Sequence, residues 1–190
     1  MPKRAFAVTA AAVAAAVTAA SCSGSTPNID TGPLAGLPWK DGVQIVNESA
    51  AEHPSWHYGS LAGCVRDGVP VTLDSVEVNE LGDIRLSKVG VREIDGSDMA
   101  GAMPGDLPAK YSSLAGYVVS DQCGTDPGVE LVLQFDTPAA AAGINGFIVN
   151  YHRGDERYRT LFAARIILCA GDRAPLHSDD GEVFDYCTAE

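Results

Sequence analysis

Three arginines near the end of the chain have the spacing of a binding surface. Arg157, Arg159 and Arg165 alternate with apolar and aromatic residues along a strand-like run. Side chains of a β-strand point alternately to opposite faces, so the three guanidinium groups lie on one face. A guanidinium can bind a carboxylate or phosphate through two parallel hydrogen bonds, which makes this row a candidate anion site. The favoured alternative is local pairing with Glu130, Asp136 or another acidic residue.

A second candidate lies in the C-terminal segment, which reads HSDDGEVFDYC. Its weak candidate metal ligands are Asp179, Asp180, Glu182 and Asp185. Clustered carboxylates suit Ca²⁺, but two adjacent aspartates do not match the alternating spacing of a calcium loop. A solvated acidic turn is therefore the default interpretation.

His53 and His57 form a third candidate, within the sequence EHPSWHY. The H-x3-H spacing brings two imidazoles together on a helix, but here Pro54 lies between them. A loop or strand edge packed by Trp56 and Tyr58 is the favoured interpretation over a metal site.

Catalytic motifs of high specificity are absent from the sequence. The nearest match to a nucleophile elbow is GSLAG, in which the serine is misplaced and no helix follows. The sequence also lacks a glycine-rich phosphate loop. We therefore expect no enzyme activity and no cofactor, and keep as an alternative an enzyme whose residues converge from separate loops.

The elements that must position these residues are strands. Apolar residues alternate with polar ones in short runs separated by Gly, Pro, Asn and Asp. The runs are 69–79, 84–94, 114–120, 129–136, 147–151 and 158–168, with 43–47 as a seventh. In the run 129–136, Glu130, Gln134 and Asp136 are expected to face outward. The pattern predicts an all-β fold, an immunoglobulin-like β-sandwich of six to seven antiparallel strands, with a small β-barrel as the alternative.

Two of these runs contain a change of phase. In 69–79 the apolar set passes from Val71 and Leu73 to Val76, and in 84–94 a similar change follows Leu86. A phase change indicates a β-bulge or a bend. The two runs are therefore predicted to form a hairpin that bends sharply or passes from one sheet to the other. A short helix is predicted over 137–143, where Thr-Pro precedes four alanines and a glycine.

Four cysteines follow residue 60: Cys64, Cys123, Cys169 and Cys187. An even number in an extracytoplasmic chain predicts two disulfides. Three connectivities are open. Strands that alternate in direction would place Cys64 and Cys169 at the same pole, which favours Cys64–Cys169 and Cys123–Cys187.

The fifth cysteine, Cys22, ends an uncharged alanine-rich stretch that follows Met-Pro-Lys-Arg. A basic start and an apolar stretch are typical of a secretory signal. The order Ala-Ala-Ser-Cys resembles the lipobox of bacterial lipoproteins, although Ala19 stands where leucine is usual. The resemblance implies cleavage before Cys22 and lipidation of its thiol. We expect a signal peptide over 1–21, a flexible tether over 22–38 and one β-sandwich domain over 39–190, with an acidic C-terminal tail.

The spacing of Cys64, Cys123 and Leu168-Cys169 also resembles uncharacterised lipoproteins of actinobacteria. That resemblance implies no activity.

The net charge of the chain indicates which classes of partner it can bind. The chain has a formal net charge of −12 at pH 7, which disfavours nucleic acid. We expect a binding or interaction module on the extracytoplasmic face of the cell membrane, lipid-anchored at Cys22. Its expected partner is an envelope protein or polymer. A structural protein of the cell envelope is the alternative.

Overall fold

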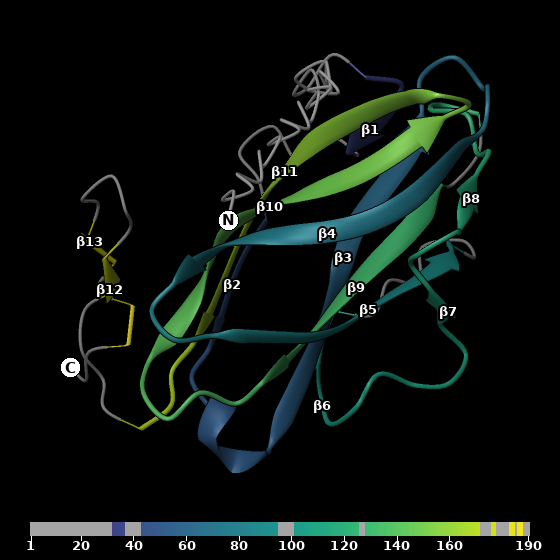
Figure 1. The fold of residues 1–190 in the computed structure, drawn as a ribbon. Helices are drawn as coiled ribbons and strands as arrows, with labels where there is room; N and C mark the ends of the chain where they lie inside the picture. The colour runs from purple at the N-terminus through teal and green to yellow at the C-terminus, as the bar shows by residue number, and fades with distance from the viewer. Residues whose placement is uncertain are drawn as a thin grey trace, which may run out of the picture.

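The computed structural model describes residues 32–36, 43–94, 101–125, 128–171, 176–177, 183–184 and 186–187. Two β-sheets dominate this part of the chain, and its helical structure is one 3₁₀ turn, Ala50–Glu52. Figure 1 shows the sheets as two layers, with β4, β10 and β11 in front of β3 and β9. The predicted all-β sandwich is confirmed.

The first sheet has the strand order β1-β3-β9-β5-β7, and β6 also pairs with β3. Its strands are β1 (Leu34–Gly36), β3 (Ser55–Val65), β9 (Val129–Asp136), β5 (Arg85–Glu93), β7 (Ser112–Ser113) and β6 (Ala102–Pro104). Strand β3 is not among the strands predicted from the sequence, because its glycines and its histidine interrupt the alternation. It nevertheless lies beside β9 at the centre of the sheet.

The second sheet has the strand order β2-β11-β10-β4-β8. Its strands are β2 (Val43–Asn47), β11 (Glu156–Leu168), β10 (Ala142–Arg153), β4 (Val71–Leu81) and β8 (Val118–Val119). Strand β2 runs parallel to β11, whereas the other named strand pairs are antiparallel. A separate pair, β12 (Leu176–His177) and β13 (Val183–Phe184), follows the second sheet in the sequence.

Aromatic side chains fill the space between the two sheets. Phe147 and Phe162 stack with their ring centroids 4.9 Å apart, and Tyr58 is fully buried beside Phe135. Asn47 Nδ2 donates a hydrogen bond of 2.8 Å to the Tyr58 hydroxyl, which satisfies this polar group in the core. Burial raises the pKa of Tyr58 to about 12.

Both predicted phase changes are β-bulges. The pairing of β4 with β10 shifts beside Asp74, between Leu73 and Ser75, and the pairing of β5 with β9 shifts beside Ser87. The two strands do not pair with each other, because β4 belongs to the second sheet and β5 to the first. The chain passes between the sheets at a turn in which Gly82 has a φ of +74°. Of the two alternatives, passage from one sheet to the other is the one observed.

The predicted helix over 137–143 is wrong. Thr137 donates its backbone N–H to Pro54 O at 2.9 Å, and β10 already begins at Ala142. Ala141 and Ala142 are buried. Four alanines are too few to form a stable helix against this tertiary pairing.

The predicted disulfide pairing is also wrong, although two disulfides do form. The bonds are Cys64–Cys123 and Cys169–Cys187, with Cα–Cα distances of 5.1 and 5.3 Å. Strand β3 adds one strand that is not among the predicted runs, and the strands do not form one continuous series of hairpins, so the expected poles of the cysteines do not hold. In the structure the chain returns beside the end of β3, where Val65 donates its N–H to Asp121 O at 2.7 Å.

The outward face of β9 is not exposed as predicted. Glu130 and Gln134 are on this face, but they are 0% and 3% exposed. Residues 101–113, which we call the strap, cover it: Leu107 N donates to Gln134 Oε1 at 2.7 Å and Gln134 Nε2 donates to Asp106 Oδ1 at 3.0 Å. Arg92 pairs with Glu130 at 2.6 Å.

Candidate binding groove

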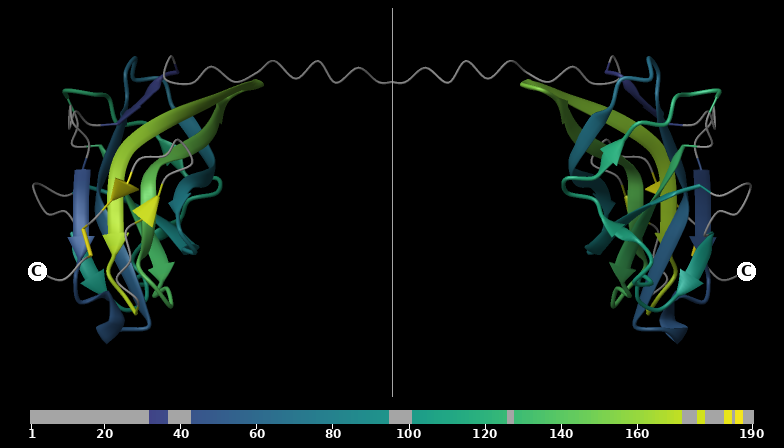
Figure 2. Two further views of the ribbon diagram at one scale, coloured as in Figure 1. Left: turned by 90° about the vertical axis from the view of Figure 1, so that its left-hand side faces the viewer. Right: turned by 90° about the vertical axis from the view of Figure 1, so that its right-hand side faces the viewer.

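A hairpin of two long strands positions the arginine row. Strands β10 and β11 pair along their whole length, with Ala142 opposite Leu168 at one end and Arg153 opposite Glu156 at the other. Their turn consists of Gly154 and Asp155. Figure 2 shows the tip of this hairpin curving away from the first sheet, so the outer face of the second sheet is concave there. Strand β4 borders the hairpin along β10.

A groove of about 650 Å³ lies on this concave face. Its lining residues come from β4, β10, the turn and β11: Asp74, Ser75, Glu77, Asn150, Tyr151, His152, Gly154, Asp155, Arg157, Tyr158 and Arg159. Carboxylates, guanidinium groups, an amide and a hydroxyl all line it. A groove of this composition can hold a polar ligand by several hydrogen bonds.

Hydrogen bonds between strands fix one wall of the groove. Glu77 accepts a 2.7 Å bond from Arg159 Nη2 and a 2.8 Å bond from Asn150 Nδ2. Asn150 Nδ2 also lies 3.1 Å from Ser75 Oγ. Because the bulge at Asp74 resets the alternation of β4, Ser75 and Glu77 point to the same face as Asn150 and Arg159.

A second polar pair lies nearer the tip of the hairpin. His152 Nδ1 is 2.8 Å from Asp74 Oδ1, and both side chains are about two-fifths exposed. A histidine oriented by a carboxylate can act as a base when a nucleophile lies within reach. Within the described residues, no hydroxyl or thiol is hydrogen-bonded to His152.

The three arginines of the row have different environments. The alternation of buried and exposed positions along β11 places all three side chains on the outer face. Arg159 is paired with Glu77, an acidic residue of β4, and not with Glu130 or Asp136. The expected local pairing is therefore confirmed for this arginine, with a different partner.

Arg165 lies outside the groove and donates from Nε and Nη2 to Asn145 Oδ1, at 3.3 and 3.2 Å, and from Nη1 to the Tyr186 hydroxyl at 3.3 Å. Arg157 is exposed and lines the groove, and within the described residues it has no hydrogen bond or ion pair. Its guanidinium is the group of the row that is available to a ligand.

Two contacts hold the hairpin close to its turn. Arg153 donates from Nη1 and Nη2 to the two carboxylate oxygens of Asp67, both at 2.8 Å. The hydrogen bonds from Arg153 lower the pKa of Asp67 to about 2. On the inner face, the rings of Tyr151 and Tyr158 stack with their centroids 5.5 Å apart.

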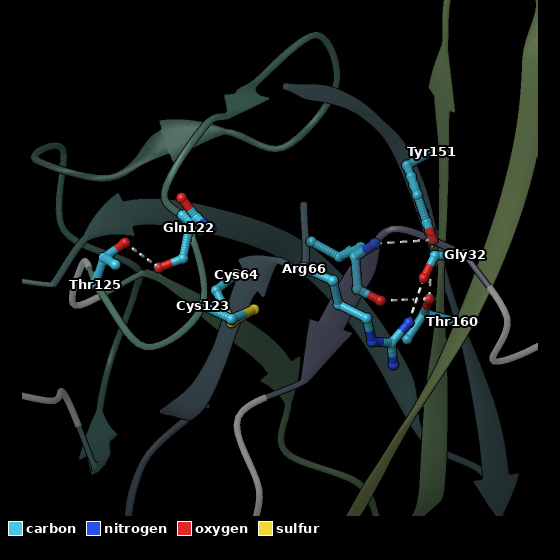
Figure 3. Close-up of a disulfide and its surroundings, with 9 residues drawn as sticks. Gly32, Cys64, Arg66, Gln122, Cys123, Thr125, Tyr151 and Thr160 are labelled. Atoms are coloured by element: carbon cyan, nitrogen blue, oxygen red, sulfur yellow. Dashed lines mark hydrogen bonds between the residues drawn. A yellow bond between two sulfur atoms is a disulfide. The ribbon is translucent and has the colours of Figure 1, made fainter. Parts of the chain in front are cut away.

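Strand β1 attaches to the same hairpin from inside, as Figure 3 shows. The Tyr151 hydroxyl accepts a 3.2 Å bond from Leu34 N, and Thr160 Oγ1 donates to Leu34 O at 3.2 Å. A Cβ at Gly32 would lie 2.0 Å from the Tyr151 hydroxyl, so glycine is required for this close approach. The hairpin that carries Arg157 is thus anchored close to its turn and on its inner face.

The other predicted sites are not assembled in the described residues. His53 packs edge-on against Trp56 at 5.3 Å, whereas His57 is buried and its Nδ1 lies 3.1 Å from Gly105 O. No group of three metal-ligating side chains occurs in the described part of the chain. Cys22 and the candidate metal ligands Asp179, Asp180, Glu182 and Asp185 lie outside the described residues.

Sequence reasoning missed the residues that complete the groove. Glu77 and Ser75 follow the phase change in β4, so their outward position could have been found from the alternation. Their proximity to Arg159 could not, because it requires β4 and β11 to flank β10.

Comparison with known proteins adds no family assignment. No family model matches this chain, and neither a curated protein nor a solved structure matches it. Among the described residues, no helix has the length and apolar character needed to cross a membrane.

Proposed function

We propose that this protein is a lipid-anchored, extracytoplasmic binding module whose groove at the β10–β11 hairpin binds an anionic group of an envelope polymer or envelope protein. The observation that carries the proposal is Arg157, an exposed guanidinium that faces a 650 Å³ groove without a partner among the described residues. A carboxylate or phosphate would complete its hydrogen bonds.

The other groups of the groove make it selective. Glu77, Asp74 and Asp155 are acidic, so a ligand of uniform high negative charge would be repelled over part of its length. Asn150 and Ser75 can exchange hydrogen bonds with hydroxyl or amide groups. The arrangement suits a polar chain with spaced acidic groups, such as a carboxylated polysaccharide.

The proposed attachment at Cys22 rests on the resemblance of the sequence to a lipobox, and the two disulfides add support for an extracytoplasmic location. Disulfides persist in oxidising compartments outside the cytoplasm, which is where a lipobox-type signal would deliver the chain. If the anchor is correct, Cys22→Ser abolishes partition into a detergent phase while the domain remains folded. A serine variant that still partitions into detergent after signal removal would show that the anchor is wrong.

Binding is tested with the full chain and two probes, polygalacturonate for carboxylates and polyphosphate for phosphates. Arg157→Gln should weaken binding of polygalacturonate by about fivefold, the upper range for an exposed pair of charges. Arg157→Lys should retain part of the affinity, because it keeps the charge but loses the paired hydrogen bonds.

Arg85→Gln is the matched control. It removes one positive charge from a side chain that is 81% exposed on the other sheet. Equal affinity of wild type, Arg157→Gln and Arg85→Gln for both probes would overturn the proposed site. Equal losses in the two variants would show that binding follows net charge alone and would also overturn it.

A further inference from the structure

The outer edge of β5 is incompletely paired. On one side β5 pairs with β9 from Arg85 to Glu93. On the other side, among the described residues, β7 pairs with it only at Gly90 and Val91. Strand β7 ends at Ser113, so residues 85–89 have no strand partner on that side among the described residues. Figure 1 shows β5 and β7 at this margin of the first sheet.

A groove of about 430 Å³ lies beside this edge. It is lined by Lys88, Val89, Leu107, Pro108, Ala109, Tyr111, Ser112 and Ser113. Leu107, Pro108, Ala109 and Tyr111 of the strap provide one wall. The other wall consists of β5 and β7, which is the last part of the strap. An extended segment laid in the groove could continue the ladder that β7 begins.

The strap is fixed, so this groove is preformed. A Cβ at Gly90 would lie 2.5 Å from Leu107 Cδ2 and 2.9 Å from Tyr111 Cβ, which shows how closely the strap packs on β5. The Arg92 guanidinium lies 5.7 Å from the Tyr111 ring centroid. Gln134 holds the adjoining part of the strap, because it accepts a hydrogen bond from Leu107 N and donates one to Asp106 Oδ1.

The positive charge at this groove favours an occupant with acidic side chains. In a chain with a net charge of −12, the described lining of this groove includes one charged residue, and it is Lys88. A second cation lies near the groove, because Lys110 Nζ is 5.5 Å from the ring centroid of Tyr111, which lines it. On an adjacent strand, an acidic side chain opposite Lys88 would form a stabilising cross-strand pair.

The alternation of β5 defines the rest of the occupant's sequence. Lys88 is exposed on the outer face, whereas Val89 and Leu86 pack against the core. Residues of an added strand that lie opposite these two would face the core and must be apolar. We propose that the edge of β5 at residues 85–89 docks an extended segment of a partner protein in which acidic residues alternate with apolar ones.

A second copy of this chain fits the edge less well. In an antiparallel pairing of two β5 edges centred between Leu86 and Ser87, Arg85 of each copy would lie opposite Lys88 of the other. Like charges directly opposite each other destabilise a strand pair. The acidic partner segment is therefore preferred to self-association.

The test uses the full-length protein and a capped heptapeptide of alternating valine and glutamate, followed by NMR of the backbone amides. The peptide should shift the amide signals of residues 85–89 and slow their hydrogen exchange. A heptapeptide with lysine in place of glutamate is the charge control. Lys88→Glu should weaken binding of the glutamate peptide by about fivefold and strengthen binding of the lysine peptide, as expected for a direct cross-strand pair.

Arg157→Gln is the control for the hairpin groove and should leave binding of the peptide unchanged, so the two proposals can fail separately. The proposal is overturned if the glutamate peptide shifts no amide in 85–89. It is also overturned if both peptides bind Lys88→Glu and wild type equally. Concentration-dependent shifts at 85–89 without peptide would identify a second copy as the occupant instead.

Discussion

Removal of the two disulfides should have effects of different size and kind. Cys64–Cys123 closes a sequence separation of 59 residues and Cys169–Cys187 closes one of 18. In the chain-entropy model the two loops correspond to about 4 and about 3 kcal/mol of stability, a difference of about 1 kcal/mol. The perturbations are the double variants Cys64→Ala/Cys123→Ala and Cys169→Ala/Cys187→Ala.

The structure adds a reason for a larger difference. Cys64 lies at the end of β3, where the returning chain is also bonded by Cys123 N to Val65 O at 2.9 Å, so this disulfide crosslinks the body of the first sheet. Cys187 instead belongs to a small buried cluster with Leu81 and Ile167, separate from the main core between the sheets. A segment held by a small separate cluster can detach without unfolding the rest of the chain.

Urea denaturation without reductant measures the global free energy of unfolding, and hydrogen exchange measures local opening. The Cys64/Cys123 double variant should lose about 4 kcal/mol in the urea experiment. The Cys169/Cys187 double variant should lose less than about 3 kcal/mol and should instead expose the amides of Leu176 and His177 to exchange. An equal or larger global loss for the Cys169/Cys187 variant would refute this reasoning.

Two further predictions concern charge and backbone. Arg153→Gln should return the pKa of Asp67 from about 2 towards 3.8, measured by NMR titration of its carboxyl carbon. Because the folded-state pKa of Asp67 is lowered, the stability that Asp67 contributes in wild type is present above pH 3.8 and is lost as the pH falls towards 2. If Arg153→Gln unfolds in acid at the same pH as wild type, this prediction is wrong. Gly128→Ala should cost about 3 kcal/mol, because φ is +86° and the new Cβ would lie 2.6 Å from Gly63 O. In Gly154→Ala, where φ is +56° and no atom lies within 4 Å, the cost should be about 1 kcal/mol, and thermal melts showing equal losses would refute the steric argument.

Several features of this protein follow from its sequence alone, because they depend on local periodicity. Alternation along 129–136 and 158–168 predicts strands, and the structure has β9 and β11 there. The phase changes in the runs 69–79 and 84–94 predict bulges, which lie beside Asp74 and Ser87. Even the common face of the arginine row is a property of one strand.

Tertiary structure decided which strands are neighbours, and this determined the site. Glu77 and Arg159 are separated by 82 residues, and they meet because β10 lies between β4 and β11. The chain crosses from one sheet to the other after β4. Counting strand directions along the sequence therefore gave the wrong disulfide pairs. Pairing energies depend on the burial of both faces of every strand at once, and a period of two residues carries no information about the partner. For that reason the sequence determines the face of β11 on which Arg157 lies. Only the tertiary structure decides which side chains of other strands lie near its guanidinium.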